Sequence, residues 1–280
     1  MLISEAIDKV KKYYRGTVGG KPIDPNTTRD KVLWGNTDQE LTAVVTCIYP
    51  SIDVIKKAIE LNANLIISHE ACFWNHGDHT DWLADNETFK QKTALLDSAN
   101  ICVWRNHDYI HSCMQLEDGS YTDGIFYGFM KKFGWDEYLI GDIARPVKFE
   151  IPTTTIGELT KLIKDKLDLN GIKVMGSLNS KASRVWVCGH IDGRNDNNIL
   201  KEMEENNFDT LITLECTDYT VTEYVRDSTM LGRDKTIIAL GHFNQEEPGM
   251  EYMVEYLPKI LGDDIPYTFV KTTDMFVFQK

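Results

Sequence analysis

The sequence lacks the paired cysteines of a disulfide framework or a zinc ribbon. Its six cysteines are scattered over 280 residues, and no two of them form a CxxC pair. In a chain of this length, such spacing indicates reduced, mostly buried thiols. We therefore expect a cytoplasmic protein.

A long apolar run is also missing. No stretch approaches the ~20 apolar residues that a membrane-spanning helix needs. The N-terminal residues Met1–Ala6 lack the basic region and the long apolar region of a signal peptide. Neither a Walker A loop nor a Rossmann GxGxxG motif occurs. We therefore expect no membrane partner, and no independent sign of a nucleotide pocket is present.

Basic side chains are in the minority. Thirty Lys and Arg stand against 43 Asp and Glu, which gives a formal net charge of −13. Nonspecific nucleic-acid binding depends on Lys and Arg that neutralise phosphates, so we expect no direct nucleic-acid binding. With 42% hydrophobic residues, the chain can bury one substantial core or two moderate ones.

Apolar, β-branched runs alternate with helical patterns in the first half of the chain. Strands are expected at Val44–Ile48, Asn64–Ile67 and Ile101–Trp104, with helices at Ile52–Leu61 and Glu87–Ser98 between them. Strands joined by helices pair in parallel through right-handed crossovers. This half therefore predicts an α/β lobe.

The alternation restarts after a polar stretch that contains Pro146 and Pro152, so we place a lobe boundary there, with lobes at 1–145 and 146–280. The expected elements of the second lobe are helices at Ile156–Leu167, Asn198–Asn206 and Pro248–Leu261, and strands at Val185–Gly189, Thr210–Thr213, Thr236–Leu240 and Met275–Phe278. The sequence thus predicts an α/β protein of two lobes with mainly parallel or mixed sheets.

Histidine and carboxylate side chains follow several of these strands. His69 and Glu70 come directly after Asn64–Ile67 and Ser68, and His107 and His111 follow Ile101–Trp104. Ligands gather at the carboxyl ends of strands in open α/β sheets. Imidazole and carboxylate together suit divalent Zn, Fe, Mn, Co or Ni. These positions are therefore candidates for metal ligands, and helix capping or simple solvent exposure is the alternative reading.

The segment Gly241–Glu246 gives the strongest local signal. Gly241 frees the backbone at a strand end, and His242 and Glu246 are four residues apart. Residues at i and i+4 lie on one side of a helical turn and can share a metal ion. The alternative is that His242 only donates to a backbone carbonyl.

In this order along the chain, these motifs resemble the NIF3-like (DUF34) family, whose members are also called GTP cyclohydrolase 1 type 2. The matching stretches are Leu65–Glu70, His107–His111 and Gly241–Gly249, supported by Leu33–Asn36, Val187–Gly189 and Leu211–Glu215. The family has Ser/Thr-His-His after a strand, a later stretch that supplies an Asp, and Gly-His-Tyr-x-x-Glu near the C-terminus. The resemblance covers nearly the whole chain, and the C-terminal motif is the most specific of the three.

Two positions depart from the family pattern. Glu70 stands where the family has a second His, and His111 stands where it has Asp. The exchange keeps three imidazoles and two carboxylates, so the resemblance implies a dinuclear centre in the cleft between the lobes. The implied ligands are His69, Glu70, His111, His242 and Glu246, with Glu246 bridging the ions. Drift after the loss of one ion is the competing reading.

The resemblance implies two divalent metal ions per chain and a metal-dependent hydrolase. His107 and Glu215 match family positions and are the candidates for acid/base catalysis, and His190 is a candidate to face the cavity. The expected substrate is a small molecule, such as GTP, another nucleotide or a phosphoester. A metal-dependent binding or regulatory scaffold without turnover is the alternative, and a metal-free α/β protein would need the motifs to be accidental. The family fold also implies a homo-oligomer, a hexameric ring.

Overall fold

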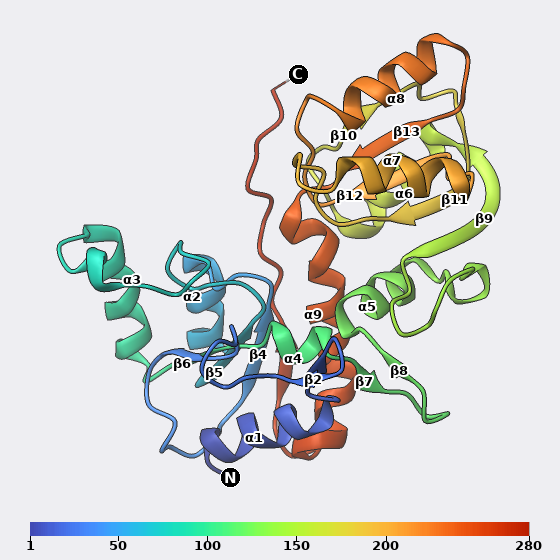
Figure 1. The fold of residues 1–280 in the computed structure, drawn as a ribbon. Helices are drawn as coiled ribbons and strands as arrows, with labels where there is room; N and C mark the ends of the chain where they lie inside the picture. The colour runs from blue at the N-terminus through green and yellow to red at the C-terminus, as the bar shows by residue number, and fades with distance from the viewer. Residues whose placement is uncertain (280) are drawn as a thin grey trace. The chain divides into compact units, whose positions relative to one another are not determined.

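The computed structural model describes residues 1–279, which form two compact units (Figure 1). The first unit comprises Met1–Gly128 with Glu247–Thr272. The second comprises Phe129–Glu246 with the C-terminal residues from Thr273 onward. Two helices, α5 (Gly124–Phe133) and α9 (His242–Leu261), begin in one unit and end in the other.

The first unit contains a five-stranded sheet with the order β14-β4-β5-β6-β3. Its strands are β14 (Tyr267–Phe269), β4 (Val44–Cys47), β5 (Leu65–Ser68), β6 (Cys102–Arg105) and β3 (Val32–Trp34). The first four run parallel, and β3 is antiparallel to β6. Every residue of β4, β5 and β6 is buried, as expected for a parallel sheet with both faces covered.

Helices and hairpins complete this unit. They are α1 (Ile3–Tyr13), α2 (Ile52–Glu60), α3 (Glu87–Ser98), α4 (Asp108–His111), the 3₁₀ turn η1 (Asp81–Leu83), and the hairpins β1–β2 (Thr17–Val18, Lys21–Pro22) and β7–β8 (Met114–Gln115, Tyr121–Thr122). Ser51 caps α2 by accepting a hydrogen bond from the Val54 amide, and Asn86 caps α3 in the same way. The two expected helices therefore begin directly after the residues that cap them.

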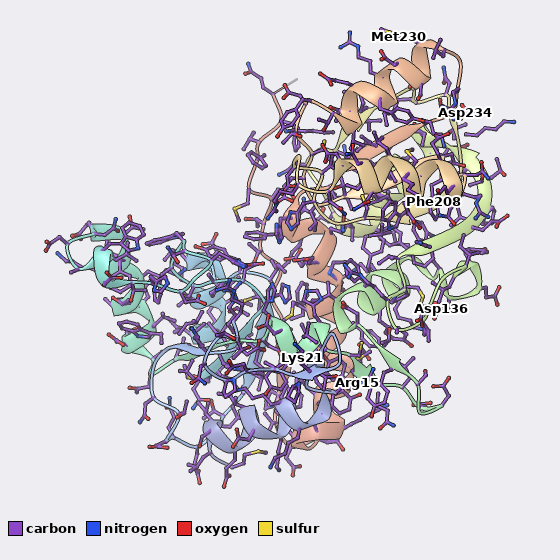
Figure 2. All side chains as sticks on the ribbon, viewed as in Figure 1. Arg15, Lys21, Asp136, Phe208, Met230 and Asp234 are labelled. Atoms are coloured by element: carbon purple, nitrogen blue, oxygen red, sulfur yellow. The ribbon has the colours of Figure 1, made fainter. Side chains whose placement is uncertain are left out.

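The second unit contains a five-stranded sheet with the order β10-β13-β12-β11-β9. Its strands are β10 (Lys173–Met175), β13 (Thr236–Ala239), β12 (Thr210–Thr213), β11 (Lys181–Val187) and β9 (Lys148–Thr155). The central three are parallel, and both edge strands are antiparallel to their neighbours. Helices α6 (Ile156–Leu167), α7 (Asp196–Glu205) and α8 (Val221–Met230) and the turn η2 (Asp136–Tyr138) belong to this unit. Phe208 lies in its core, whereas Met230 at the end of α8 points into solvent (Figure 2).

The predicted α/β class with two sheet-containing lobes is confirmed. The lobe boundary at residues 145 and 146 stays a prediction. Strand β9 was not predicted, because Pro152 and three threonines interrupt its apolar pattern. Its place at the edge of the sheet explains why a proline is tolerated there.

Two predicted elements are wrong in part. Met275–Phe278 is not a strand, and the last strand is β14, which pairs with β4. Four β-prone residues form a strand only where a neighbouring edge offers hydrogen bonds, and none does so here. Helix α9 begins at His242 rather than at Pro248, so Pro248 lies inside the helix. Among the described residues, no helix combines the length and the apolar character needed to cross a bilayer.

Candidate metal centres

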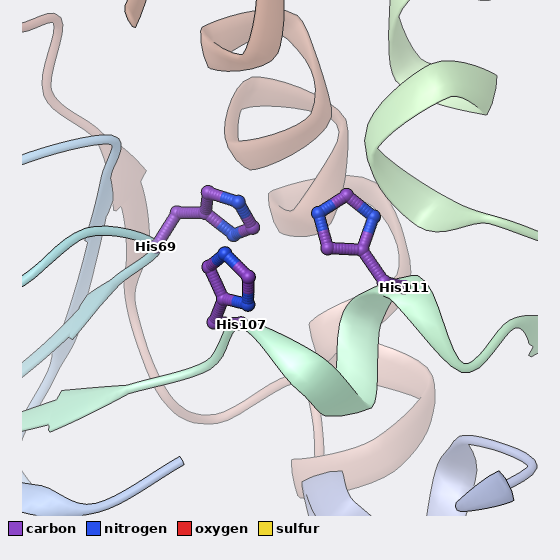
Figure 3. Close-up of side chains that lie close together, drawn as sticks. All are labelled: His69, His107 and His111. Carbon is purple, nitrogen blue, oxygen red and sulfur yellow. The ribbon is translucent and has the colours of Figure 1, made fainter. Parts of the chain in front are cut away.

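Three histidines of the first unit lie together at the carboxyl ends of two neighbouring parallel strands (Figure 3). His69 directly follows β5, His107 precedes α4, and His111 is the last residue of α4. One ring nitrogen from each can be chosen so that all three lie within 4.8 Å of one another. The rings of His69 and His107 stack with 4.6 Å between their centroids. This cluster is a candidate site for a divalent ion.

Each of the three rings is oriented through its Nδ1 atom. Nδ1 of His69 lies 3.2 Å from the carbonyl oxygen of Asn106, Nδ1 of His107 lies 2.9 Å from Asp108, and Nδ1 of His111 lies 2.8 Å from Asp123. All three partners are acceptors, so Nδ1 carries the proton and the lone pair of the neutral ring lies on Nε2. Metal-ligating histidines in proteins have this arrangement.

Burial keeps His69 in the neutral form. Its side chain is fully buried, and this burial, reinforced by the neighbouring His107 and His111, lowers the pKa of His69 well below its ordinary value. A neutral imidazole is the form that ligates metal ions. The protonation state of His69 therefore suits a metal site at neutral pH.

A buried aspartate holds α4 in place. Asp30 accepts hydrogen bonds from the amides of His107 (3.0 Å), Asp108 (2.6 Å) and Tyr109 (3.3 Å). Burial raises the pKa of Asp30, and these hydrogen bonds partly oppose that effect. Because α4 has only four residues, this cap fixes the helical turn that carries His107 and His111.

Glu70 contacts a buried arginine. Its Oε2 lies 2.9 Å from Nη2 of Arg105, whose side chain is fully buried. Arg105 also donates to the carbonyl oxygens of His69 and His76 and pairs with Asp78 at 3.0 Å. Arg105 thus ties the segment after β5 to β6. Glu70 as a metal ligand stays a prediction.

A second set of imidazoles and carboxylates lies in the second unit. His190 follows β11, Glu215 follows β12 and His242 follows β13, so all three stand at the carboxyl ends of parallel strands. Glu215 accepts from Nδ1 of His190 at 2.7 Å and from Nδ1 of His242 at 2.8 Å. Their ligand atoms can also be chosen within 4.8 Å of one another.

The first turn of α9 adds a further carboxylate to this second set. Nε2 of His242 lies 3.3 Å from Oε2 of Glu246, four residues along the helix. The expectation that both side chains lie on one side of a helical turn is therefore confirmed. Gly241, just before them, has φ +98°, a conformation that favours glycine.

Glu215 is ionised at neutral pH. Burial alone would raise its pKa, but the hydrogen bonds and charges of His242 and His190 lower it below its ordinary value. A carboxylate held in this way can bind a cation or accept a proton, and it cannot donate one.

The structure thus groups some predicted residues and adds others. His69 lies with His111, and His242 lies with Glu246, but His107, expected as a catalytic residue, lies inside the histidine cluster. The catalytic roles of His107 and Glu215 stay predictions. Sequence reasoning missed the orienting residues Asp30, Asp108 and Asp123. Of these, only Asp108 could have been predicted from the sequence, because it is adjacent to His107.

Comparison with known proteins identifies the family of this chain. The model of the family described as Duf34/NIF3 (NGG1p interacting factor 3) matches residues 31–275. A protein of Clostridium acetobutylicum named GTP cyclohydrolase 1 type 2 homolog is 23% identical over 248 residues, which are 84% of each chain. A protein of Clostridium perfringens with the same name is 24% identical over 257 residues, covering 88% of this chain and 90% of the relative.

Solved structures share the fold. A hypothetical protein of Staphylococcus aureus superposes with a TM-score of 0.70 at 16% identity, covering 100% of this chain and 99% of that one. A Bacillus cereus protein related to NIF3 gives the same TM-score at 14% identity and the same coverage. The family match spans most of the sequence, so this chain belongs to the Duf34/NIF3 family.

Proposed function

We propose that this protein binds two divalent metal ions per chain and is a metal-dependent hydrolase. The observation that carries the proposal is the orientation of His69, His107 and His111, each held through Nδ1 by an acceptor. Three neighbouring imidazoles that all donate through Nδ1 present three Nε2 lone pairs, which is the arrangement of metal-ligating histidines. The second set, His190, Glu215, His242 and Glu246, would hold the other ion.

The donor types limit the metal. The first set offers three imidazoles, the second offers imidazole and carboxylate, and neither offers a thiolate, which suits Zn, Fe, Mn, Co or Ni. A bound divalent ion supplies Lewis acidity to a carbonyl or phosphoryl oxygen. The ionised carboxylate of Glu215 is available to accept a proton, and Asp108 and Asp123 hold their histidines in one tautomer.

A nucleotide or phosphoester is the proposed substrate class. The two clostridial relatives carry the name GTP cyclohydrolase 1 type 2 homolog. His190 also borders a cavity of 610 Å³ in the second unit, whose wall includes Arg145, Lys148 and Arg194 against a single acidic residue, Asp192. Lys148 pairs with Glu202 and Arg194 with Asp192, so the proposed substrate class is supported by the names of the relatives and not by a free positive charge on this wall.

Metal content and turnover test the proposal together. Inductively coupled plasma mass spectrometry on untagged protein should give about two ions per chain. We expect one ion to be lost in His111→Ala and one in His242→Ala/Glu246→Ala, with no loss in the control His79→Ala, since His79 belongs to neither set. No ion after reconstitution would refute metal binding.

Turnover is measured on the same metal-loaded protein with GTP and 4-nitrophenyl phosphate. Hydrolysis that disappears in His242→Ala/Glu246→Ala supports the hydrolase. Ions bound without turnover of either compound would instead favour a binding or regulatory scaffold. The hexameric ring stays part of the proposal, and light scattering after size exclusion would check it, since the chain mass is 32.1 kDa.

A further inference from the structure

An apolar cavity adjoins the metal-ligand set of the second unit. It has a volume of 270 Å³, and Glu215 and His242 form part of its wall. Phe243, Phe276 and Phe278 are among the apolar side chains that line it. An apolar cavity of about 150 Å³ accommodates benzene, so this one has room for a ring system of one or two fused rings.

The C-terminal segment Thr273–Gln279 supplies two of the three aromatic rings. It is anchored to the turn after α6 at two points. Asp274 accepts a hydrogen bond of 2.5 Å from the amide of Asn170, and the ring of Phe278 packs on Gly171, where a Cβ would lie 2.5 Å from it. Between these anchors, Phe276 lines the cavity although the residue is 68% exposed. Exposed aromatic surface at the wall of a cavity marks a binding site for an apolar group.

One polar atom at this wall lacks a partner. Asp274 also lines the cavity, and its Oδ1 is buried without a hydrogen bond from any described residue. A buried carboxylate oxygen without a donor is unfavourable. An N–H group of a ligand would satisfy it.

We propose that this cavity binds a planar nitrogen heterocycle, which is the ring of the substrate whose reacting group lies at Glu215 and His242. The aromatic side chains provide the stacking surface, and Asp274 accepts from a ring N–H. The assignment of this ring to a substrate rests on the proposed function. The ring site itself does not depend on the proposed function, because its residues can bind a ring without a metal ion.

Binding of indole and benzofuran to the metal-free 280-residue chain tests the site, because the two compounds are planar analogues that differ in the N–H group. We expect saturable indole binding by ligand-observed NMR that weakens about tenfold in Phe276→Ala, which removes a stacking ring. Val277→Ala is the matched control, since Val277 is 94% exposed and does not line the cavity. In Asp274→Asn, the preference for indole over benzofuran should disappear. Absence of saturable binding, or equal binding in the Phe276 and Val277 variants, would overturn the proposal.

Binding of phenylphosphonate and methylphosphonate tests whether the ring site and the metal ions bind the same substrate. With metal-loaded protein, we expect phenylphosphonate to bind about tenfold more tightly than methylphosphonate, and Phe276→Ala to remove that advantage. If neither phosphonate binds in a metal-dependent way while indole still binds, the hydrolase proposal fails and the ring site stands. If both phosphonates bind equally well to the wild type, the metal site stands and the substrate assignment of the ring is wrong.

Discussion

Carboxylates that orient histidines contribute to metal affinity although they do not touch the ion. Asp123 accepts from Nδ1 of His111 through Oδ2, and through Oδ1 it accepts from the amides of Ile125 and Phe126 at the start of α5. Oδ2 therefore orients the histidine, whereas Oδ1 caps the helix. Substitution by Asn can keep the helix cap while it removes the acceptor for the histidine.

We expect Asp123→Asn to lower zinc affinity by about 10- to 100-fold, measured by competition with a chromophoric chelator. The free energy of unfolding of the metal-free protein should change little. Asp118→Asn is the control, because Asp118 lies in the β7–β8 hairpin just before Asp123 and accepts hydrogen bonds from the amide and the hydroxyl of Ser120. Equal zinc affinity in all three proteins would exclude an orienting role for Asp123.

Arg105 is a fully buried cation with two carboxylate partners, Glu70 and Asp78. Arg105→Met would leave both carboxylates in a poorly hydrated site without their partner. We expect the free energy of unfolding, measured in urea at pH 7, to fall by about 3–5 kcal/mol.

A triple variant separates the charge effect from the packing effect. Arg105→Met with Glu70→Gln and Asp78→Asn removes all three charges, so part of the lost stability should return. If the single and the triple variants are equally unstable, the ion pairs are not the cause.

At the scale of elements, α5 and α9 meet backbone to backbone in the first unit. A Cβ on Gly249 would lie 2.5 Å from Cα of Ile125, and a Cβ on Gly128 would lie 2.5 Å from Cα of Gly249. Neither contact can be relieved by turning a side chain. Gly249→Ala should therefore separate the helices and cost about 1–3 kcal/mol of stability in thermal unfolding. Gly189→Ala, where a Cβ meets nothing within 4 Å, should be nearly neutral.

Glu204 connects α7 to its neighbours in the second unit. It accepts from Tyr224 on α8 (2.5 Å) and pairs with Arg233 (2.6 Å) and Lys235 (3.1 Å). Burial raises the pKa of Glu204, but these partners outweigh it and lower the pKa from 4.5 to about 2.

The unfolded chain therefore takes up this proton first as the pH falls, and stability present above pH 4.5 is lost between 4.5 and about 2. Urea midpoints measured from pH 5 to pH 3 should fall less steeply in Glu204→Gln than in the wild type. The control Glu205→Gln removes only a 3.7 Å contact with Lys201, so it should keep the wild-type slope. Parallel slopes in all three proteins would refute this linkage.

The elements that the sequence predicts well are those with a local signal. Strands β4, β5 and β12 are short runs of buried, mostly apolar residues bounded by turns, and their pattern identifies them without a structure. Strand β9 depends on an edge position, and the segment Met275–Phe278 depends on a missing neighbour, so neither is decided by local sequence.

Residues of the candidate sites are likewise predictable only where the local sequence carries a signal. His69 and His242 are recognisable because each follows a strand. Asp30 is not, because it caps a helix 77 residues away along the chain.

At the scale of the whole molecule, fold and metal binding are separate questions. The likeness to solved structures at 14 to 16% identity shows the fold. Which residues of this chain bind metal ions has to be argued from its own side chains. Each compact unit has its own sheet and contributes three side chains, His69, His107 and His111 or His190, Glu215 and His242, whose ligand atoms lie within 4.8 Å of one another. Each unit should therefore respond to metal ions through its own histidines.

A ligand that binds only the native state stabilises it by about 2.7 kcal/mol when its free concentration is 100 times Kd. Thermal unfolding of the wild-type protein should therefore shift upward with Zn²⁺ or Mn²⁺ and return to the metal-free value with EDTA. His111→Ala and His242→Ala should each keep part of this shift, because each leaves the other ligand set intact, and the double variant should lose it. A full shift in the double variant would mean that the ions bind elsewhere. A complete loss in either single variant would mean that the two sets do not bind metal independently.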